Sequence, residues 1–488
     1  MFESFKLEKK AVLFLLFHSV LWFAVGLILD VHPDMADHWV WSQTLAFGYY
    51  EHPPFVALTM LPTNWFGNAV VALKLGSALF SSLIFYLAYV LGKELFNEKT
   101  AFTYLLILES TLYFSFGSVF WHIDQPYMAF WLLGLLVIAK WAKAENPNWM
   151  LAFGAVAGFG AVSKYIMVLF PLSMFFWLAV CPKSRKLPKQ WQTYAGALLA
   201  MAILAPNIYW NYTHEWVTFV YNFQKGLTGA EPLKQFSIFQ AGQLFLFSIV
   251  MSGAFWVLLA LKKISSWTEV EGGNAAVLFL KVSGLIPLLF FSYTSFLGRG
   301  SDPHWLNIAY FSFFLFLAHH LTHEGSHYRA KLLVPAFVIN GILVVLVIWQ
   351  VLANPLDLSP DQNKIFAKVN GWPEVSEAAS GRLTDYGLTM PDFTITREYQ
   401  FGGVLALYLE GHPLSHSIEK PIRNDWSHVE TLKKTGALLF CPPAECRVTL
   451  KKAKARFESN FDDLGSIQVV KHGVTLHDLQ LYYLRPVQ

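Results

Sequence analysis

Charged residues are scarce in this chain. Asp, Glu, Lys and Arg make up only 14% of its 488 residues, whereas a soluble domain has about 25%. Hydrophobic residues account for 55% of the chain, and its mean hydropathy is +0.41. So few charges cannot cover a water-exposed surface of this size. The composition therefore excludes a disordered chain, a basic nucleic-acid-binding protein and an ordinary cytosolic enzyme, and it indicates a polytopic membrane protein.

Cysteine is also rare, and internal repeats, Gly/Ser linkers and low-complexity tracts are not visible. The three cysteines are Cys181, Cys441 and Cys446. Cys441 and Cys446 stand five residues apart in the polar C-terminal part. In an oxidising compartment this spacing is compatible with a small disulfide loop, and two free thiols are the alternative.

Long apolar runs, by contrast, are abundant. A helix that crosses a bilayer needs about 20 predominantly apolar residues, and runs of this kind predict about eleven spans. They lie near 11–29, 67–92, 101–119, 125–142, 149–163, 165–181, 192–210, 240–261, 275–296, 304–321 and 332–352. The first run lacks a small-x-small cleavage site, so we expect an anchor rather than a cleavable signal peptide.

Lysine and arginine collect in alternate connectors between these runs, which predicts that those connectors are cytoplasmic. The opposite connectors carry only Lys164, Lys225, Lys234 and Arg299. The odd number of spans then places the C-terminal part outside. Because the orientation rule disfavours cations on the outer side, each of these four residues is a candidate for function.

The chain changes character after residue 352. We therefore divide it into a transmembrane domain, 1–352, and a small soluble α/β domain, 353–488, on the outer face. Strands are predicted at Phe393–Thr396, Ala437–Cys441 and Gln480–Leu484, and a helix at Phe401–Leu409.

The first outer loop, about 30–66, is rich in functional side chains. Apolar residues recur at helical spacing from Ala36 to Phe47, which predicts an amphipathic helix at the membrane interface that ends at Gly48. Asp34 stands at its start, where a carboxylate either caps the helix or acts in a site. Asp34, Glu51 and His52 could hold a divalent metal ion, although no strict ligand spacing is present.

Further motifs follow in the connectors predicted on the outer face. The first loop contains Asp34-x-Ala36-x-x-Trp39 and Gly48-Tyr49-Tyr50-Glu51-His52-Pro53-Pro54. Later come His122-Ile123-Asp124-Gln125-Pro126, Ser163-Lys164-Tyr165, Pro206-Asn207 with Trp210-Asn211 and His214-x-Trp216, Gly298-Arg299 with Pro303-His304-Trp305, and Arg397-Glu398-Tyr399-Gln400. In this order, the set resembles the outer loops of bacterial aminoarabinose and undecaprenyl-phosphate-sugar glycosyltransferases. These enzymes belong to the protein O-mannosyltransferase superfamily of polytopic GT-C enzymes.

The resemblance implies a GT-C fold and transfer of a hexosyl or pentosyl group from a polyprenyl-phosphate donor to an envelope acceptor such as lipid A or lipopolysaccharide. Such a reaction needs a carboxylate to handle the acceptor and positive charge for the leaving phosphate. We assign Asp34 and Asp124 as catalytic, and His52, Lys164 and Arg299 as donor-phosphate ligands. Substrate contacts are expected from Asp37, Glu51, Tyr165, His214 and His304.

The sequence departs from the family pattern at two positions, which leaves the sugar and the metal open. Met35 replaces an acidic residue, and His52 stands where aminoarabinose transferases often have Lys.

Structural roles are the alternative for several of these side chains. Asp124 could cap the fourth span, Lys164 could reach outer headgroups, Arg299 could pair with Asp302, and His214 could anchor the chain at the interface. Glu109, in the middle of the third span, could pair with Lys74 or Lys281 or have a function.

Other functions also remain open at this stage: a transporter or flippase of lipid-linked sugars, a protein O-glycosyltransferase, or a non-catalytic scaffold. A transporter usually places polar groups near the bilayer midplane, often within repeats, whereas here they gather on one face. We expect a monomer in the bacterial inner membrane that faces the periplasm. Its expected partners are the lipid-linked donor and a lipid or glycolipid acceptor, not nucleic acid.

Overall fold

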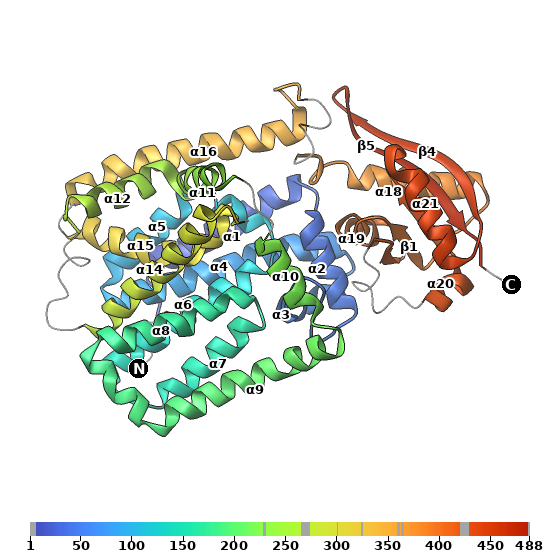
Figure 1. Cartoon of the computed structure of the whole chain (residues 1–488). Helices are drawn as coiled ribbons and strands as arrows, with labels where there is room; N and C mark the ends of the chain where they lie inside the picture. The colour runs from blue at the N-terminus through green and yellow to red at the C-terminus, as the bar shows by residue number, and fades with distance from the viewer. Residues whose placement is uncertain are drawn as a thin grey trace.

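The protein consists of a helical bundle with a sheet-bearing C-terminal part at one end (Figure 1). The coordinates are a computed structural model, and they describe residues 6–227, 231–264, 274–299, 301–323, 326–358, 362, 366–419 and 429–486. The α8–α9 connector, which carries Lys183, Arg185, Lys186 and Lys189, lies at the end of the bundle opposite the C-terminal part. One of the predicted basic connectors is therefore far from the C-terminal part.

The bundle is built from helices that coincide with the predicted apolar runs. They are α1 (Lys9–Ile28), α4 (Ala69–Leu95), α5 (Glu98–Glu109), α6 (Asp124–Ala144), α7 (Trp149–Ala161), α8 (Leu169–Val180), α9 (Trp191–Thr213), α11 (Pro232–Leu246), α12 (Gly253–Ala260), α14 (Ala275–Phe296), α15 (Asn307–Thr322) and α16 (Arg329–Ala353). Asparagines fix several of the starts, because Asn68, Asn97 and Asn274 each accept a hydrogen bond from a backbone N–H of the first turn.

The chain is a multi-pass membrane protein, but the predicted count of eleven spans is not confirmed. Within the described residues, six helices are long and apolar enough to cross a membrane, or up to eight if two bent pairs each form one span. The third predicted run shows why length falls short. Its helix stops at Glu109, where the hydroxyls of Ser110 and Thr111 donate to the carbonyls of Ile107 and Leu108 and compete with helix continuation.

The position of each helix in the bundle follows from its apolar surface. α15 buries nearly all of its residues at the centre, whereas α9 and α16 expose large apolar side chains such as Leu198, Met201 and Val345. In a membrane protein, this exposed apolar surface faces lipid.

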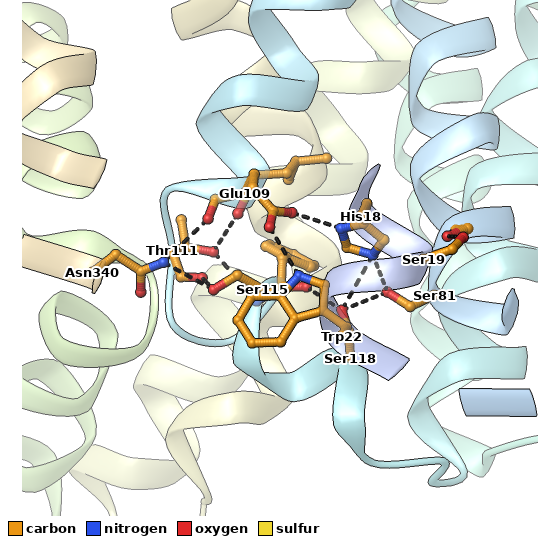
Figure 2. A network of polar contacts seen from close by, with 12 residues as sticks. His18, Ser19, Trp22, Ser81, Glu109, Thr111, Ser115, Ser118 and Asn340 are labelled. Carbon is orange, nitrogen blue, oxygen red and sulfur yellow. Dashed lines mark hydrogen bonds and ion pairs between the residues drawn. The ribbon is translucent and has the colours of Figure 1, made fainter. Parts of the chain in front are cut away.

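A buried polar network joins four helices inside the bundle (Figure 2). The Glu109 carboxylate lies 2.7 Å from Nδ1 of His18 and accepts a hydrogen bond from Nε1 of Trp22. Nε2 of His18 lies 3.0 Å from the Ser81 hydroxyl, and Asn340 of α16 donates to the Glu109 carbonyl. The expectation that Glu109 pairs with Lys74 or Lys281 is therefore wrong. Lys74 donates instead to the carbonyl of Asp30, near the outer end of α1.

This network predicts a large loss of stability for Glu109→Ala. The substitution leaves His18 buried without its partner, and breaking a buried pair costs about 3–5 kcal/mol. Thermal unfolding of the purified protein should show a clear fall in Tm. Ser19→Ala, which removes only the nearby Ser19–Ser82 hydrogen bond, is the control and should change Tm little. An unchanged Tm in Glu109→Ala would contradict a stabilising role for the pair.

The C-terminal part contains a five-stranded mixed sheet in the order β2-β1-β3-β5-β4. Its elements are α18 (Trp372–Asp385), β1 (Phe393–Thr396), α19 (Tyr399–Tyr408), β2 (Leu414–Ser417), α20 (Val429–Thr435), β3 (Ala437–Cys441), α21 (Pro443–Phe457), β4 (Phe461–Lys471) and β5 (Val474–Leu484). β1 pairs in parallel with β2 and β3, and β5 pairs antiparallel with β3 and β4. The predicted α/β character is confirmed.

The predicted strands at Phe393–Thr396 and Ala437–Cys441 match β1 and β3, and the third is the end of the longer β5. The sequence analysis missed β2 and β4, because Leu414–Ser417 is short and polar and β4 is interrupted by charged residues and Gly465. Cys441 and Cys446 form a disulfide between the end of β3 and the start of α21.

The first outer loop differs from the prediction of an amphipathic helix at the membrane interface. Its helix, α2 (Pro33–Gln43), is buried from Met35 to Ser42, and it is followed by α3 (Phe55–Met60). It ends at Gln43 rather than Gly48, because the Tyr49 hydroxyl folds back and donates to the carbonyl of Trp41. α19 covers α2 (Figure 1), so protein rather than lipid contacts this helix.

One apolar core also runs from this loop into the C-terminal part, through Met35, Trp39, Val404 and Leu405 among others. The predicted domain boundary at residue 352 therefore does not separate two hydrophobic cores. The division into two domains stays a prediction.

Candidate active site

A cavity of about 460 Å³ lies where the bundle meets the C-terminal part. It is lined by residues of α2, the loop after it, η4 (Tyr165–Val168), α10 (Val217–Leu227), η8 (Pro303–Leu306) and α19. Of the predicted site residues, the lining includes Asp34, Asp37, Glu51, His52, Lys164, Tyr165 and His304. Segments far apart in the sequence thus bring most of the predicted residues to one place.

Asp34 lines the cavity and does not cap α2. The cap of α2 is His32, whose Nδ1 accepts the backbone N–H of Asp34 at 3.2 Å. The Asp34 carboxylate is 31% exposed and lines the cavity. Its Oδ1 accepts a hydrogen bond from the Gln400 amide. The interpretation of Asp34 as the helix cap is therefore wrong.

Asp124 and Lys164 form a buried ion pair at the wall of the cavity. Nζ of Lys164 lies 2.5 Å from Oδ1 of Asp124, and the two side chains are only 8% and 6% exposed. The Tyr113 hydroxyl donates to the other oxygen of Asp124 at 3.1 Å, and Nε2 of His304 lies 3.7 Å from it. Lys164 therefore does not reach out to lipid headgroups, and it brings its charge to the cavity already partly neutralised.

Asp124 itself faces a second, mostly apolar cavity of about 330 Å³ rather than the first. Asp34, His122 and His304 line both cavities. In this arrangement, Asp124 contacts Lys164 and His304, which line the first cavity. Its direct contact with the reacting atoms stays a prediction.

Tyr165, which lines the first cavity, is held by a neighbouring amide. The Tyr165 hydroxyl donates to Oδ1 of Asn207 at 2.7 Å, and the Asn207 amide donates to the carbonyl of Phe47. Gly48 packs directly on Trp210, so that an added Cβ would come within 2.4 Å of the indole ring. The first-loop motif and the Asn207–Trp210 motif are thus two sides of one contact.

Two further predicted residues, Arg299 and His214, line neither of these two cavities. Arg299 is exposed in the turn after α14. The His214 ring stacks on Trp210 at 4.0 Å, and its Nδ1 lies 2.7 Å from the Trp210 carbonyl. A structural role fits His214. The predicted substrate contacts of Arg299 and His214 stay predictions.

The cavity is also lined by residues that the sequence analysis did not assign to the site. Lys225 of α10 lines it, with Nζ 5.6 Å from the Trp305 ring centre. His38, His122, Asp302, Tyr399 and Gln400 line it as well. Lys225 was one of the four outer-side cations, and Tyr399 and Gln400 belong to the quoted Arg397–Gln400 motif. That signal was therefore present in the sequence.

The histidines of the first loop are neutral near pH 7. Burial lowers the pKa of His52 to about 3 against the opposing effect of Glu51, and burial lowers the pKa of His32 to about 4 against that of Asp34. The pKa of His38 is lowered well below its usual value, again mainly by burial and then by His122. His52 can thus offer a phosphate an N–H group but not a positive charge.

These lowered pKa values predict an acid-sensitive fold. The unfolded chain protonates its histidines near pH 6.5, whereas the folded protein resists until about pH 4 at His32. Unfolding therefore takes up protons in this window, and stability that is present above pH 6.5 falls as the pH drops toward 4. Tm measured from pH 7.5 to 4.5 should decline through this range, and less steeply in His52→Gln. A flat Tm between pH 7 and 5 would contradict the prediction.

The metal hypothesis gains no support from the geometry. Across the described ranges, no group of three or more His, Cys, Asp or Glu side chains is arranged to hold a metal ion. Asp34 and Glu51 accept hydrogen bonds from Gln400 and Tyr399 instead. Asp34, Glu51 and His52 are therefore not arranged as a set of metal ligands in the described residues. The metal requirement stays a prediction.

Comparisons with known proteins agree with this architecture. The model of the dolichyl-phosphate-mannose-protein mannosyltransferase family matches residues 51–210. The lipid A galacturonosyltransferase RgtD of Rhizobium johnstonii is 24% identical over 192 residues, which are 38% of this chain and 39% of that protein. ArnT from Cupriavidus metallidurans, solved with undecaprenyl phosphate, aligns over 97% of this chain and 98% of its own with a TM-score of 0.63. The chain thus resembles this family over residues 51–210 and has the fold of ArnT over nearly its whole length.

The ArnT fold extends over 97% of the chain, although the sequence match is partial. The apo state of the same ArnT aligns with a TM-score of 0.64, and the identity to both ArnT structures is 14%. The structural likeness therefore establishes the fold, including the C-terminal part. The match to the curated relative spans 39% of its length.

Proposed function

We propose that this protein is a membrane glycosyltransferase that moves a sugar from a polyprenyl-phosphate donor to lipid A or a similar envelope acceptor. The observation that carries the proposal is the cavity in which the oriented carboxylate of Asp34 and the ammonium of Lys164 both line the wall. Two comparisons support the proposal: RgtD is named as a lipid A galacturonosyltransferase, and ArnT, which has the same fold, was solved with undecaprenyl phosphate bound.

In the proposed reaction, an acceptor oxygen attacks the anomeric carbon while the bond from that carbon to the phosphate oxygen breaks. Positive charge develops on the sugar ring, as in other glycosyl transfers. Negative charge grows on the leaving phosphate. Asp34 takes the proton of an acceptor hydroxyl, or orients an acceptor phosphate that is already ionised. Lys164 and Lys225 stabilise the departing phosphate by charge, and His52 by its N–H group.

The membrane supplies the rest of the site. A polyprenyl chain is apolar and stays in the bilayer, so its phosphate must meet the protein at the interface. The cavity lies where the bundle meets the C-terminal part, and Lys164 and the first residues of α19 line it. In the proposed arrangement, the donor phosphate contacts Lys164 while the polyprenyl chain stays in the bilayer.

The test uses purified protein in lipid nanodiscs with lipid A and one of two donors, undecaprenyl-phosphate-linked galacturonic acid or aminoarabinose. We expect lipid A to gain the mass of one sugar with one donor, with stoichiometric release of undecaprenyl phosphate. Release of the sugar into water without transfer would overturn lipid A as acceptor but keep the enzyme. In a parallel assay with sealed vesicles in place of nanodiscs, movement of the donor across the bilayer without turnover would support a flippase and overturn the proposal.

The proposed periplasmic location of the site makes a separate prediction. Alkaline phosphatase fused after Gln488 should be active in a bacterial host, and green fluorescent protein at the same place should be dark, because basic connectors stay in the cytoplasm. Fusion in the α8–α9 connector, which holds Lys183, Arg185, Lys186 and Lys189, should give the reverse result. Fluorescence from the C-terminal fusion would overturn the orientation.

A further inference from the structure

The start of α19 is pressed against the first outer loop. An added Cβ at Gly403 would come within 2.7 Å of the Asp37 backbone, and one at Gly402 within 1.7 Å of the Ser415 hydroxyl. Only glycine allows α19 to lie this close to both α2 and β2. The C-terminal part also forms hydrogen bonds with the same loop. The Tyr408 hydroxyl accepts the backbone N–H of Val31, and the backbone N–H of Trp372 donates to the carboxylate of Asp30.

The turn that leads from β1 into α19 is fixed by its own hydrogen bonds. The Thr396 hydroxyl donates to the carbonyl of Glu398, and the Ser417 hydroxyl donates to the carbonyl of Arg397. The Arg397 guanidinium pairs with Glu419 and Glu445, each at 2.7 Å. The first residues of α19 therefore have a defined position above the cavity.

These first residues contact two carboxylates of the candidate active site. The Tyr399 hydroxyl donates to Oε2 of Glu51 at 2.6 Å, and the Gln400 amide donates to Oδ1 of Asp34. Both side chains line the cavity. No other hydrogen bond from the described residues reaches the Asp34 carboxylate. Its Oδ2 lies 3.8 Å from Nδ1 of His32 and 3.9 Å from Nε2 of His122, which are the nearby titratable groups.

We propose that Gln400 is a positioning residue for Asp34, so that the C-terminal part completes the active site formed by the bundle. This inference rests on the proposed function. The amide binds one carboxylate oxygen and leaves the other for the acceptor. Because the amide is a neutral donor, it fixes the carboxylate without adding a charge that would compete with the acceptor. The Tyr399 hydroxyl likewise donates to Glu51, which also lines the cavity.

The main test compares Gln400→Ala and Gln400→Glu with the wild type in the transfer assay over pH 5.5–9. We expect Gln400→Ala to lower kcat about tenfold or more with little change in the KM for the donor, because the carboxylate loses its alignment. Gln400→Glu places two carboxylates in contact, which must share a proton at low pH. The acid limb of its kcat/KM profile should therefore move to higher pH, which a purely structural contact would not cause.

A second test moves α19 without changing a polar group. Gly403→Ala must displace α19 from Asp37, so it should lower kcat as Gln400→Ala does. Gly381→Ala in α18 is the matched control, because its added Cβ meets nothing within 4 Å, and it should leave kcat unchanged. Tm is measured for all variants, and Gln400→Ala, which removes one partly exposed contact, keeps the test decisive if Gly403→Ala does not fold.

The outcomes separate this inference from the proposed function. If the wild type transfers sugar and both Gln400 variants keep wild-type kcat and pH profiles, the positioning role is overturned and the glycosyltransferase stands. If the wild type transfers nothing from either donor, the proposed function fails first, and the inference fails with it.

Discussion

Asp34→Asn is expected to lower sugar transfer by about 10²-fold or more, the range for loss of a positioned acid–base group. The variant should still fold, because His32 rather than Asp34 caps α2, and because the Asn carbonyl can still accept the Gln400 amide. The loss should thus appear in kcat with little change in Tm. The measurement is steady-state transfer with each undecaprenyl-phosphate donor, together with thermal unfolding.

Asp385→Asn is the matched control. Asp385 is exposed at the end of α18 and lies outside the cavity lining, so the same chemical change should leave kcat and Tm unaltered. Near wild-type turnover in Asp34→Asn would remove Asp34 from the reaction. The cavity would then have to use Asp37 or Glu51, which also line it.

Lys164→Met is expected to damage both folding and turnover. It leaves the Asp124 carboxylate buried without its cation, and breaking such a pair costs about 3–5 kcal/mol. The double variant Lys164→Met/Asp124→Asn removes both charges and should recover most of the lost Tm. Turnover should stay low in the double variant, because no ammonium remains at that wall to stabilise the departing phosphate.

This comparison separates two roles of Lys164. If the double variant regains wild-type turnover, Lys164 only neutralises Asp124, and the phosphate must depend on other groups such as Lys225. Arg299→Ala provides the contrast, because Arg299 is exposed and does not line the cavity. We expect Arg299→Ala to leave kcat near the wild-type value. This expectation differs from the sequence analysis, which assigned Arg299 as a ligand of the donor phosphate.

Much of the molecule follows from local properties of the chain. The apolar runs determine where the membrane helices lie, because a backbone in lipid must satisfy its own hydrogen bonds and a helix does so within one segment. The short β-branched and aromatic runs likewise predict β1 and β3 correctly. Seven of the ten residues that were assigned to the site line the cavity, because residues on one side of a membrane have a limited surface on which to meet.

The tertiary structure alone decided which polar groups are partners. Glu109 pairs with His18 rather than a lysine, Asp124 with Lys164, and Asp34 with Gln400. These partners stand 91, 40 and 366 residues apart in the chain. The same holds for α2, whose composition suits a membrane interface but which α19 covers. Helix packing, not local sequence, sets such contacts, because a buried charge is stable only beside whichever group the fold brings to it.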